Sequence, residues 1–344
     1  MFYKKKTDPN KTAVKYIPCA TERTRRHLLI GGITLLGLAP LSVFAEAYPN
    51  RPISLIAGAS SGGSVDIGAR IVAKSLSDEL GVPVIVENKP GATGVIGTRY
   101  VAKAPPDGYT LMFGGPSASI VGPQTQKTAD SFDAVKEIVG INMVTKGPMA
   151  VAINPSLKVE NFKALVELSK TRQVMLGVPG IGGAPDLMVK ELNKFTGAKF
   201  ETVPYKGLGA AINDAIGGQI DGVASDLGPF VPFLKGGRLN VLAVTSKERF
   251  AEFPDIPAVA ESYSGFAVDS WLGIFAPAKT PPAVIDKVNA ALVNVSNNSE
   301  VKAIFLQSAS LTAPMKTPAD FQKFVANEYN RWGDVLKEFN LLKN

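Results

Sequence analysis

Cysteine and histidine are almost absent from this chain. Among its 344 residues the only Cys is Cys19 and the only His is His27, so neither type occurs after residue 47. The rest of the chain therefore has no disulfide, no Cys nucleophile, no Ser-His-Asp triad and no zinc site built from Cys or His. Any catalysis there would depend on carboxylate, Lys, Tyr or Ser side chains.

A strong basic excess is also missing once the N-terminal segment is set aside. The chain has a formal net charge of +7, and residues 1–47 hold eight Lys or Arg but only three Asp or Glu. Residues 48–344 therefore carry a net charge of only +2. Binding to a phosphate backbone generally needs a marked positive excess, so we expect no nucleic acid partner.

An uncharged apolar segment lies near the N-terminus. It covers residues 28–45 and comes directly after Arg25-Arg26-His27, and its last residue begins the motif Ala45-Glu46-Ala47. This order is typical of a secretory signal peptide, so we expect the protein to be exported and residues 1–47 to be removed by cleavage after Ala45 or Ala47. The paired arginines also fit a twin-arginine signal, and both export routes stay open. An uncleaved membrane anchor is the alternative.

From residue 51 onward, short apolar runs alternate with helical patterns, which is typical of βαβ units around largely parallel sheets. The first unit has a strand at 52–57, a glycine-rich loop at 58–64, and a helix that ends at Gly81. We expect further strands at 84–86, 109–113, 174–177, 200–203, 222–224, 239–245 and 272–276, and further helices at about 95–103, 185–196, 282–295 and 318–339.

The length and this order of elements predict two doubly wound α/β domains. The run at 272–276 supplies another strand, and two crossings would let a hinge close without disrupting either core. We expect domain 1 to comprise residues 48–145 plus 270–344 and domain 2 to comprise residues 146–269.

Two loops that follow predicted strands are rich in glycine, at 58–66 and at 180–185. Ligands of open α/β sheets bind at the carboxyl ends of the strands. Each loop leads into a helix N-terminus, where backbone N–H groups and the helix dipole favour an anion such as a carboxylate or phosphate. The first loop lacks both the Gly-Lys-Ser/Thr of a P-loop and the glycine pattern of a dinucleotide fold. A plain strand-to-helix turn is the alternative for each loop.

Several segments match, in order, the pattern of one family of exported proteins. They are Tyr48–Ile53, Gly62–Arg70, Val86–Ala92, Val101–Leu111, Phe132–Glu137, Val203–Gly207, Leu242–Ser246, Pro254–Glu261 and Ser270–Trp271. On these residues the chain resembles the Bug family of periplasmic solute-binding proteins, which serve tripartite tricarboxylate transporters. The resemblance extends from Tyr48 to about Lys343.

The resemblance implies a periplasmic-binding-protein type II-like fold, whose two domains are joined by a hinge of crossing strands and close on a small carboxylate held by backbone amides, hydroxyls and water. It implies no catalysis, cofactor or metal, and as partners a small organic anion and the membrane permease of a tripartite tricarboxylate transporter. We also expect a monomer. The candidate ligand-binding residues are Ser61, Gly62, Gly63, Ser64, Asp66, Gly115, Ser117, Gly180, Gly182, Gly183, Ala184, Tyr205, Lys206, Ser225 and Asp226.

The chain departs from the family pattern within these loops. Gly58–Ser61 replaces a Pro and an aromatic residue, which predicts a more polar pocket floor. The family's later-loop Asp falls on Ser225, with Asp226 where Asn is usual, and Gly183-Ala184 stands where Ser or Thr is common. The ligand's identity therefore does not follow from the relatives.

Two other functions remain as alternatives. A ligand-sensing partner of a membrane signalling protein would use the same fold and pocket, so the sequence does not separate sensing from transport. An exported hydrolase would need, for example, a Ser-x-x-Lys pair near a strand end. Ser75 lies inside a predicted helix, and Ser117 is followed by Ile120 at the Lys position. We therefore expect a receptor and not an enzyme.

Overall fold

The computed structural model describes residues 48–126 and 132–342. The predicted signal peptide, at residues 1–47, lies outside these ranges. Within them, no helix has both the length and the apolar character that crossing a membrane requires.

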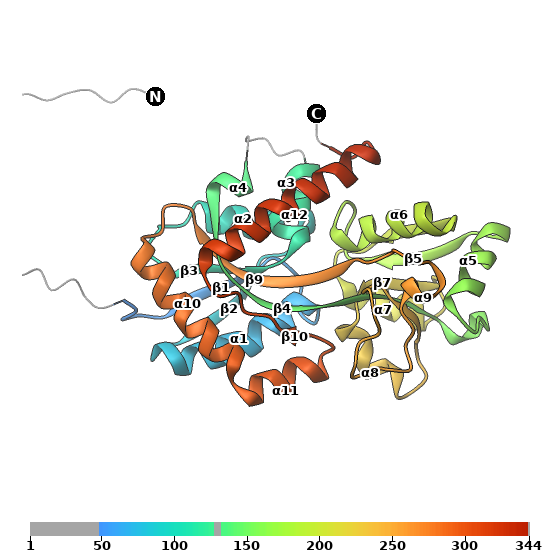
Figure 1. Cartoon of the computed structure of the whole chain (residues 1–344), viewed down its shortest axis with the longest axis horizontal. Coiled ribbons are helices and arrows are strands. Elements are labelled where there is room, and N and C mark those ends of the chain that lie inside the picture. The colour runs from blue at the N-terminus through green and yellow to red at the C-terminus, as the bar shows by residue number, and fades with distance from the viewer. Residues whose placement is uncertain (1–47, 127–131, 343–344) are drawn as a thin grey trace, which may run out of the picture. The chain divides into compact units, whose positions relative to one another are not determined.

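Helices and strands alternate along most of the described chain (Figure 1). The strands are β1 (Ile53–Ala57), β2 (Val84–Asn88), β3 (Thr110–Gly114), β4 (Ile138–Ile153), β5 (Val174–Val178), β6 (Phe200–Pro204), β7 (Gly222–Asp226), β8 (Asn240–Val244), β9 (Asp269–Pro277) and β10 (Leu311–Thr312). The helices are α1 (Ser64–Leu80), α2 (Val95–Ala102), α3 (Gly122–Thr125), α4 (Ala134–Glu137), α5 (Phe162–Thr171), α6 (Ala184–Thr196), α7 (Leu208–Ile216), α8 (Val231–Leu234), α9 (Val259–Ser262), α10 (Pro282–Asn297), α11 (Ser299–Gln307) and α12 (Pro318–Glu338). Further helical turns of 3-10 or π type are η1 (Ala92–Gly94), η2 (Ser117–Val121), η3 (Pro155–Leu157) and η4 (Gly228–Phe230).

The described strands join in one hydrogen-bonded sheet with two parallel ends. Its main path is β2-β1-β3-β9-β4-β7-β5-β6, and β8 and β10 both pair with β4. β1 is parallel to β2 and β3, and β5 is parallel to β6 and β7. We call the half that contains β1–β3 the first lobe and the half that contains β5–β8 the second lobe.

β4 and β9 connect the two lobes. Residues 138–148 of β4 pair with β9, and residues 149–153 pair with β7 and β8. Figure 1 shows both strands crossing between the two groups of helices. The predicted domain boundaries, at 146 and 270, fall within these strands and stay a prediction.

Helix α1 shows how the local sequence sets the element bounds. Ala69, Val72 and Leu76 recur on one face and are fully buried, as the helical spacing predicts. The helix ends where Gly81 takes a left-handed conformation, with φ +70°. In the second lobe α6 ends in the same way at Gly197, with φ +71°. Both predicted helix ends are confirmed.

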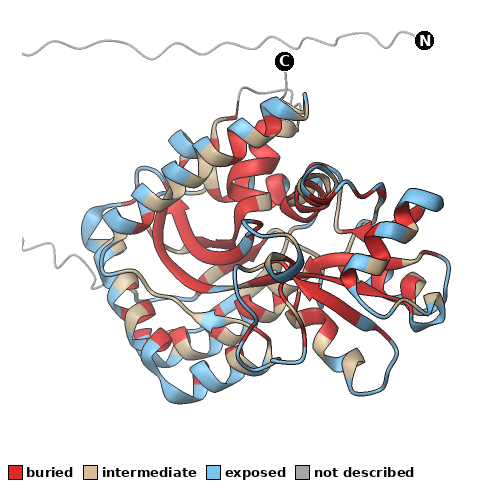
Figure 2. Ribbon diagram, turned by 45° about the vertical axis from the view of Figure 1, so that its right-hand side comes forward, coloured by how far each residue is buried: buried red, intermediate tan, exposed pale blue. Residues whose placement is uncertain are grey.

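The apolar core lies between the sheet and the helices that cover it. Figure 2 shows buried strands at the centre and exposed outer faces on the helices. Phe113, Phe275 and Phe321 are among the largest fully buried side chains. One core cluster contains residues of both lobes, such as Ile56 and Leu187, so burial of apolar surface stabilises the junction as well as each lobe.

Candidate functional site

A large cavity lies between the lobes, at the carboxyl ends of the parallel strands. We call it the main cavity; its volume is about 810 Å³. The loops after β1, β2, β3, β5 and β6 and the end of β7 all contribute to its wall. This is the position that parallel α/β topology predicts for a ligand, and the volume lies in the usual range for small-molecule sites.

Most of the predicted site residues meet at this cavity. Its lining includes Gly63, Ser64, Gly115, Ser117, Gly180, Ala184, Tyr205, Lys206, Ser225 and Asp226. The remaining predicted residues, Ser61, Gly62, Asp66, Gly182 and Gly183, are not part of the lining. The structure thus brings both glycine-rich loops to one cavity but places part of each loop away from it.

Asp66 supports the first glycine loop from behind. Its carboxylate accepts hydrogen bonds from the Gly62 N–H at 3.0 Å, Asn88 Nδ2 at 2.9 Å and Arg70 Nε at 3.1 Å. Burial opposes ionisation, yet the hydrogen bonds from Arg70, Gly62 and Asn88 hold the pKa of Asp66 below its usual value. The Asp66 carboxylate therefore stabilises the first glycine loop and helix α1 through these hydrogen bonds.

The second glycine loop has an equivalent support. The Gly182 N–H donates to Asp186 Oδ2 at 2.9 Å, and Thr202 Oγ1 donates to Asp186 Oδ1 at 2.7 Å. Asp186 is 1% exposed. The pattern Gly-Gly-x-x-Asp thus occurs at 62–66 and again at 182–186. This short repeat was not recognised in the sequence, and it would have identified both aspartates as supporting residues.

The two glycine loops differ in whether their backbone N–H groups already have hydrogen-bond acceptors within the protein. In the first loop, no described residue accepts a hydrogen bond from the N–H of Ala59, Ser60 or Gly63, which all line the main cavity. These groups can therefore donate to a bound anion beside the N-terminus of α1.

In the second loop the corresponding donors are already used. The Gly180 N–H donates to Val178 O at 2.9 Å, and the Ala184 N–H donates to Ser117 Oγ at 2.9 Å. Gly182 donates to Asp186, and Pro185 has no N–H. We expected both loops to offer free backbone N–H groups to the ligand. In the second loop, however, most of these groups already donate to acceptors within the protein.

The one cation in the described lining of the main cavity lies beside the first glycine loop. It is Lys206, whose side chain is exposed. Ser60 Oγ donates to Lys206 O at 3.2 Å, so the two loops are in contact. The neighbouring Tyr205 hydroxyl donates to Asp214 at 2.7 Å; burial and this hydrogen bond raise the pKa of Tyr205 to about 12. Lys206 therefore places one positive charge beside the first glycine loop.

Asp226 is the one carboxylate in the described lining of the main cavity. Ser64 Oγ donates to its Oδ2, which joins the first turn of α1 to the end of β7 in the other lobe. Burial raises the pKa of Asp226, and the hydrogen bonds from Ser64 and Ser270 partly oppose this effect. This pair forms one wall of the cavity.

Further hydrogen bonds cross between the lobes near the cavity. Besides the contacts of Ser60, Ser64 and Ser117, Thr125 Oγ1 lies 3.4 Å from Gly182 O, and Gln126 Nε2 lies 3.5 Å from Ile181 O. All of these contacts join hydroxyl or amide groups to the opposite lobe, so the lobes are in contact around the ligand space.

The loop after β2 is a part of the cavity wall that sequence reasoning missed. Gly91, Ala92, Thr93 and Gly94 all have positive φ and all line the main cavity. Positive φ is uncommon for residues other than glycine and marks local strain at Ala92 and Thr93. The Thr93 methyl group lies against the second glycine loop, 2.9 Å from where a Cβ on Gly180 would stand. The signal that could have identified this loop is its place after a strand parallel to β1.

A metal site is not formed by the described residues, since no three His, Cys, Asp or Glu side chains among them come together. Small polar groups and apolar side chains such as Met149 and Leu208 make up the rest of the described wall. The arrangement is suited to binding an anion through amide donors.

Comparison with known proteins identifies relatives along almost the whole described chain. The family model of the tripartite tricarboxylate transporter family receptor matches residues 68–341. Protein BugT of Bordetella pertussis is 33% identical over 303 residues, which is 87% of this chain and 92% of BugT.

Solved structures with bound carboxylates are also similar. A Rhodopseudomonas palustris protein with adipate has a TM-score of 0.80 and 27% identity, covering 84% of this chain and 97% of that one. MatC from R. palustris, with bound malate, has a TM-score of 0.78 and 25% identity, covering 84% of this chain and 100% of that one. The expected two-domain periplasmic binding protein fold is confirmed.

Proposed function

Because this chain belongs to the tripartite tricarboxylate transporter receptor family, and so is a periplasmic receptor for carboxylates, we propose that its main cavity holds a small organic carboxylate through the first glycine loop. The observation that carries this proposal is the set of N–H groups at Ala59, Ser60 and Gly63, which have no acceptor among the described residues. They belong to the loop that leads into α1, whose N-terminal dipole adds to the attraction for a negative charge.

Lys206 supplements these donors from the rim. It lies in the loop that contacts Ser60, so its charge attracts an anion toward the same end of the cavity. Because its side chain is exposed, solvent screens this charge, and the amides contribute the larger part of the affinity.

The bound structures of similar proteins support small dicarboxylates as ligands. Adipate and malate occupy two of them. A second carboxylate group or an uncharged tail would extend from the first glycine loop toward Thr93 and the second glycine loop. We therefore propose a small organic carboxylate as the ligand class, delivered to the permease of a tripartite tricarboxylate transporter and not chemically altered.

Capture and release require the lobes to separate. We propose that the domains are residues 48–145 plus 270–344 and residues 146–269, and that the crossing strands β4 and β9 act as the hinge. The hydrogen bonds of Ser60, Ser64 and Ser117 across the cavity would break on opening. We also propose that the receptor acts as a monomer after removal of residues 1–47, with cleavage after Ala45 or Ala47.

The experiment that tests this function measures binding directly. The purified protein is analysed by native mass spectrometry for a co-purifying acid, and by calorimetry with malate and with adipate. We expect a co-purifying carboxylate or binding of at least one probe, and loss of that binding in Gly63→Val. If no carboxylate co-purifies and neither malate nor adipate binds, the proposal is wrong.

A further inference from the structure

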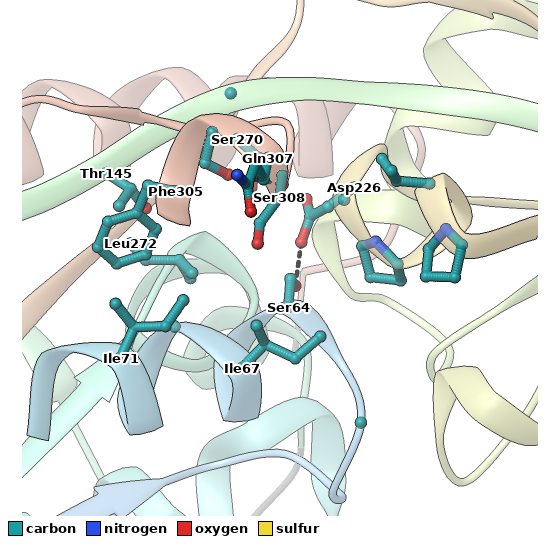
Figure 3. A pocket seen from close by; sticks show the side chains of 18 of the residues that line it. Ser64, Ile67, Ile71, Thr145, Asp226, Ser270, Leu272, Phe305, Gln307 and Ser308 are labelled. Atoms are coloured by element: carbon teal, nitrogen blue, oxygen red, sulfur yellow. Dashed lines mark hydrogen bonds between the residues drawn. The ribbon is translucent and has the colours of Figure 1, made fainter. Parts of the chain in front are cut away.

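A second cavity lies between the lobes, on the other side of the Ser64–Asp226 contact. We call it the second cavity; its volume is about 400 Å³. It shares Ser64, Asp226, Ser270 and Leu272 with the main cavity, so these residues form the wall between the two spaces. Figure 3 shows the hydrogen bond from Ser64 to Asp226 at the edge of this cavity.

Most of the wall of the second cavity is apolar. Ile67 and Ile71 project from α1 into it, and Phe305 and Leu272 face them from the opposite side (Figure 3). Pro229, Val231, Pro232 and Phe233 close the side formed by the second lobe. An organic molecule with an apolar body would therefore remove apolar surface from water on binding here.

Lys206 lines only the main cavity, so the second cavity has no counterpart of this cation among the described residues. Its described lining contains no Lys or Arg, and Asp226 is its one ionisable side chain. Figure 3 shows Ser308 and Gln307 directed into the same space as the Asp226 carboxylate. Asp226 thus faces neutral groups, and burying a carboxylate without a cation is unfavourable. A positively charged group in this cavity would relieve that cost.

We propose that the second cavity is a separate binding site for a small organic amine, whose ammonium group pairs with Asp226 and whose apolar body packs against Ile67, Ile71 and Phe305. The site is distinct from the carboxylate site because it lacks the amide donors of Ala59 and Ser60 and the cation Lys206. An anion is disfavoured there, because Asp226 is the one charged side chain in the described lining and no Lys offsets its charge, as Lys206 does in the main cavity.

The test uses benzylamine as the cationic probe and benzoate as the anionic probe, with binding to the purified protein measured by calorimetry and ligand-observed NMR. Ile67→Trp fills the second cavity without entering the main one, because Ile67 lines only the second. The matched control is Ile85→Trp, at a half-exposed isoleucine on β2 that lines neither cavity. Asp226→Asn removes the charge and keeps the size of the side chain.

We expect benzylamine affinity to fall at least tenfold in Ile67→Trp and in Asp226→Asn, and to change less than threefold in Ile85→Trp and Gly63→Val. Benzoate should show no loss of affinity in Ile67→Trp. Circular dichroism verifies the fold of each variant, and Ile71→Phe replaces Ile67→Trp if the latter is unfolded.

Three results would overturn the inference: no binding of benzylamine, unchanged benzylamine affinity in Asp226→Asn, or loss of benzylamine binding in Gly63→Val but not in Ile67→Trp. The last result would place the amine in the main cavity. None of them affects the carboxylate proposal, which is tested with malate and adipate.

Discussion

Substitution of Gly63 by valine separates ligand binding from folding more sharply than any other change at the first glycine loop. Gly63 has φ −84° and ψ 168°, which other residues adopt readily. The nearest atom to a Cβ at this position would be Ser60 O, at 3.8 Å. Valine therefore fits the free protein, and its cost to folding is limited to a poorer helix N-cap, about 1 kcal/mol.

Binding should suffer much more. Gly63 lines the main cavity between the N–H donors of the loop, so a valine side chain occupies the place where a carboxylate approaches them. A hydrogen bond to a charged group contributes about 1.5–3 kcal/mol, and loss of one such bond weakens affinity about 30-fold at 2 kcal/mol. Calorimetry with malate or adipate, whichever the unmodified protein binds, measures this loss, and urea denaturation measures stability.

The matched control is Gly62→Ala. Gly62 has φ +86°, no atom lies within 4 Å of the point where its Cβ would stand, and it is not part of the main cavity's lining. Alanine in a left-handed conformation costs about 1–2 kcal/mol, so this variant should lose stability while its affinity changes less than threefold. Full affinity in a folded Gly63→Val variant would refute the assignment of the anion to the first glycine loop.

Other substitutions test the remaining interactions. Lys206→Ala should weaken carboxylate binding less than about fivefold in calorimetry, because the charge is exposed; a larger loss would make Lys206 the principal anchor. The pKa of Asp66 is lowered in the folded state, so the stabilisation by its ionised carboxylate is present above the unfolded pKa and is lost as pH falls. Urea denaturation between about pH 6 and pH 3 should therefore show a smaller loss of unfolding free energy in Asp66→Asn than in the unmodified protein. Glu328 Oε2 accepts from both Trp271 Nε1 and Trp332 Nε1, each at 3.2 Å, so Glu328→Ala should reduce the free energy of unfolding by about 2 kcal/mol or more and change the tryptophan emission. Unchanged stability and emission would show that these indole groups do not depend on Glu328.

The sequence was sufficient to predict the βα units that build the main cavity. The apolar face of α1 and the stop at Gly81 follow from spacing and backbone chemistry alone, and the carboxyl-end rule places the loops at 58–66 and 180–185 at strand ends. These signals depend only on residues close together in the chain, so they can be recognised without the tertiary structure.

Strand β4 could not be predicted in the same way. Lys146-Gly147-Pro148 indicates a turn, yet the strand continues through it to Ile153. Pro148 lacks an N–H but pairs in register with Asp269, and its carbonyl accepts from the Leu227 N–H at 3.1 Å. Partners on both sides of β4 therefore outweigh the local preference, and the nearest of them along the chain, Gly222 opposite Ile153, is 69 residues away.

Backbone strain in the loop after β2 could not be predicted from the sequence either. Ala92 and Thr93 adopt positive φ, which their residue types disfavour, because the loop is held between Gly58 and the second glycine loop. By contrast, the repeated Gly-Gly-x-x-Asp pattern could have predicted that Asp66 and Asp186 support the two glycine loops, but this repeat was not recognised in the sequence.

The pairing of Pro148 with Asp269 makes the second lobe an insertion with adjoining ends. Pro148 of β4 and Asp269 of β9 are a cross-strand pair, so the segment 149–268 begins and ends at neighbouring points in space. Insertions with adjacent ends are tolerated because they place little geometric demand on their host. A whole second lobe from a relative could therefore be transplanted at this pair, which would make recombination of lobes a practical route to receptors and biosensors with altered selectivity.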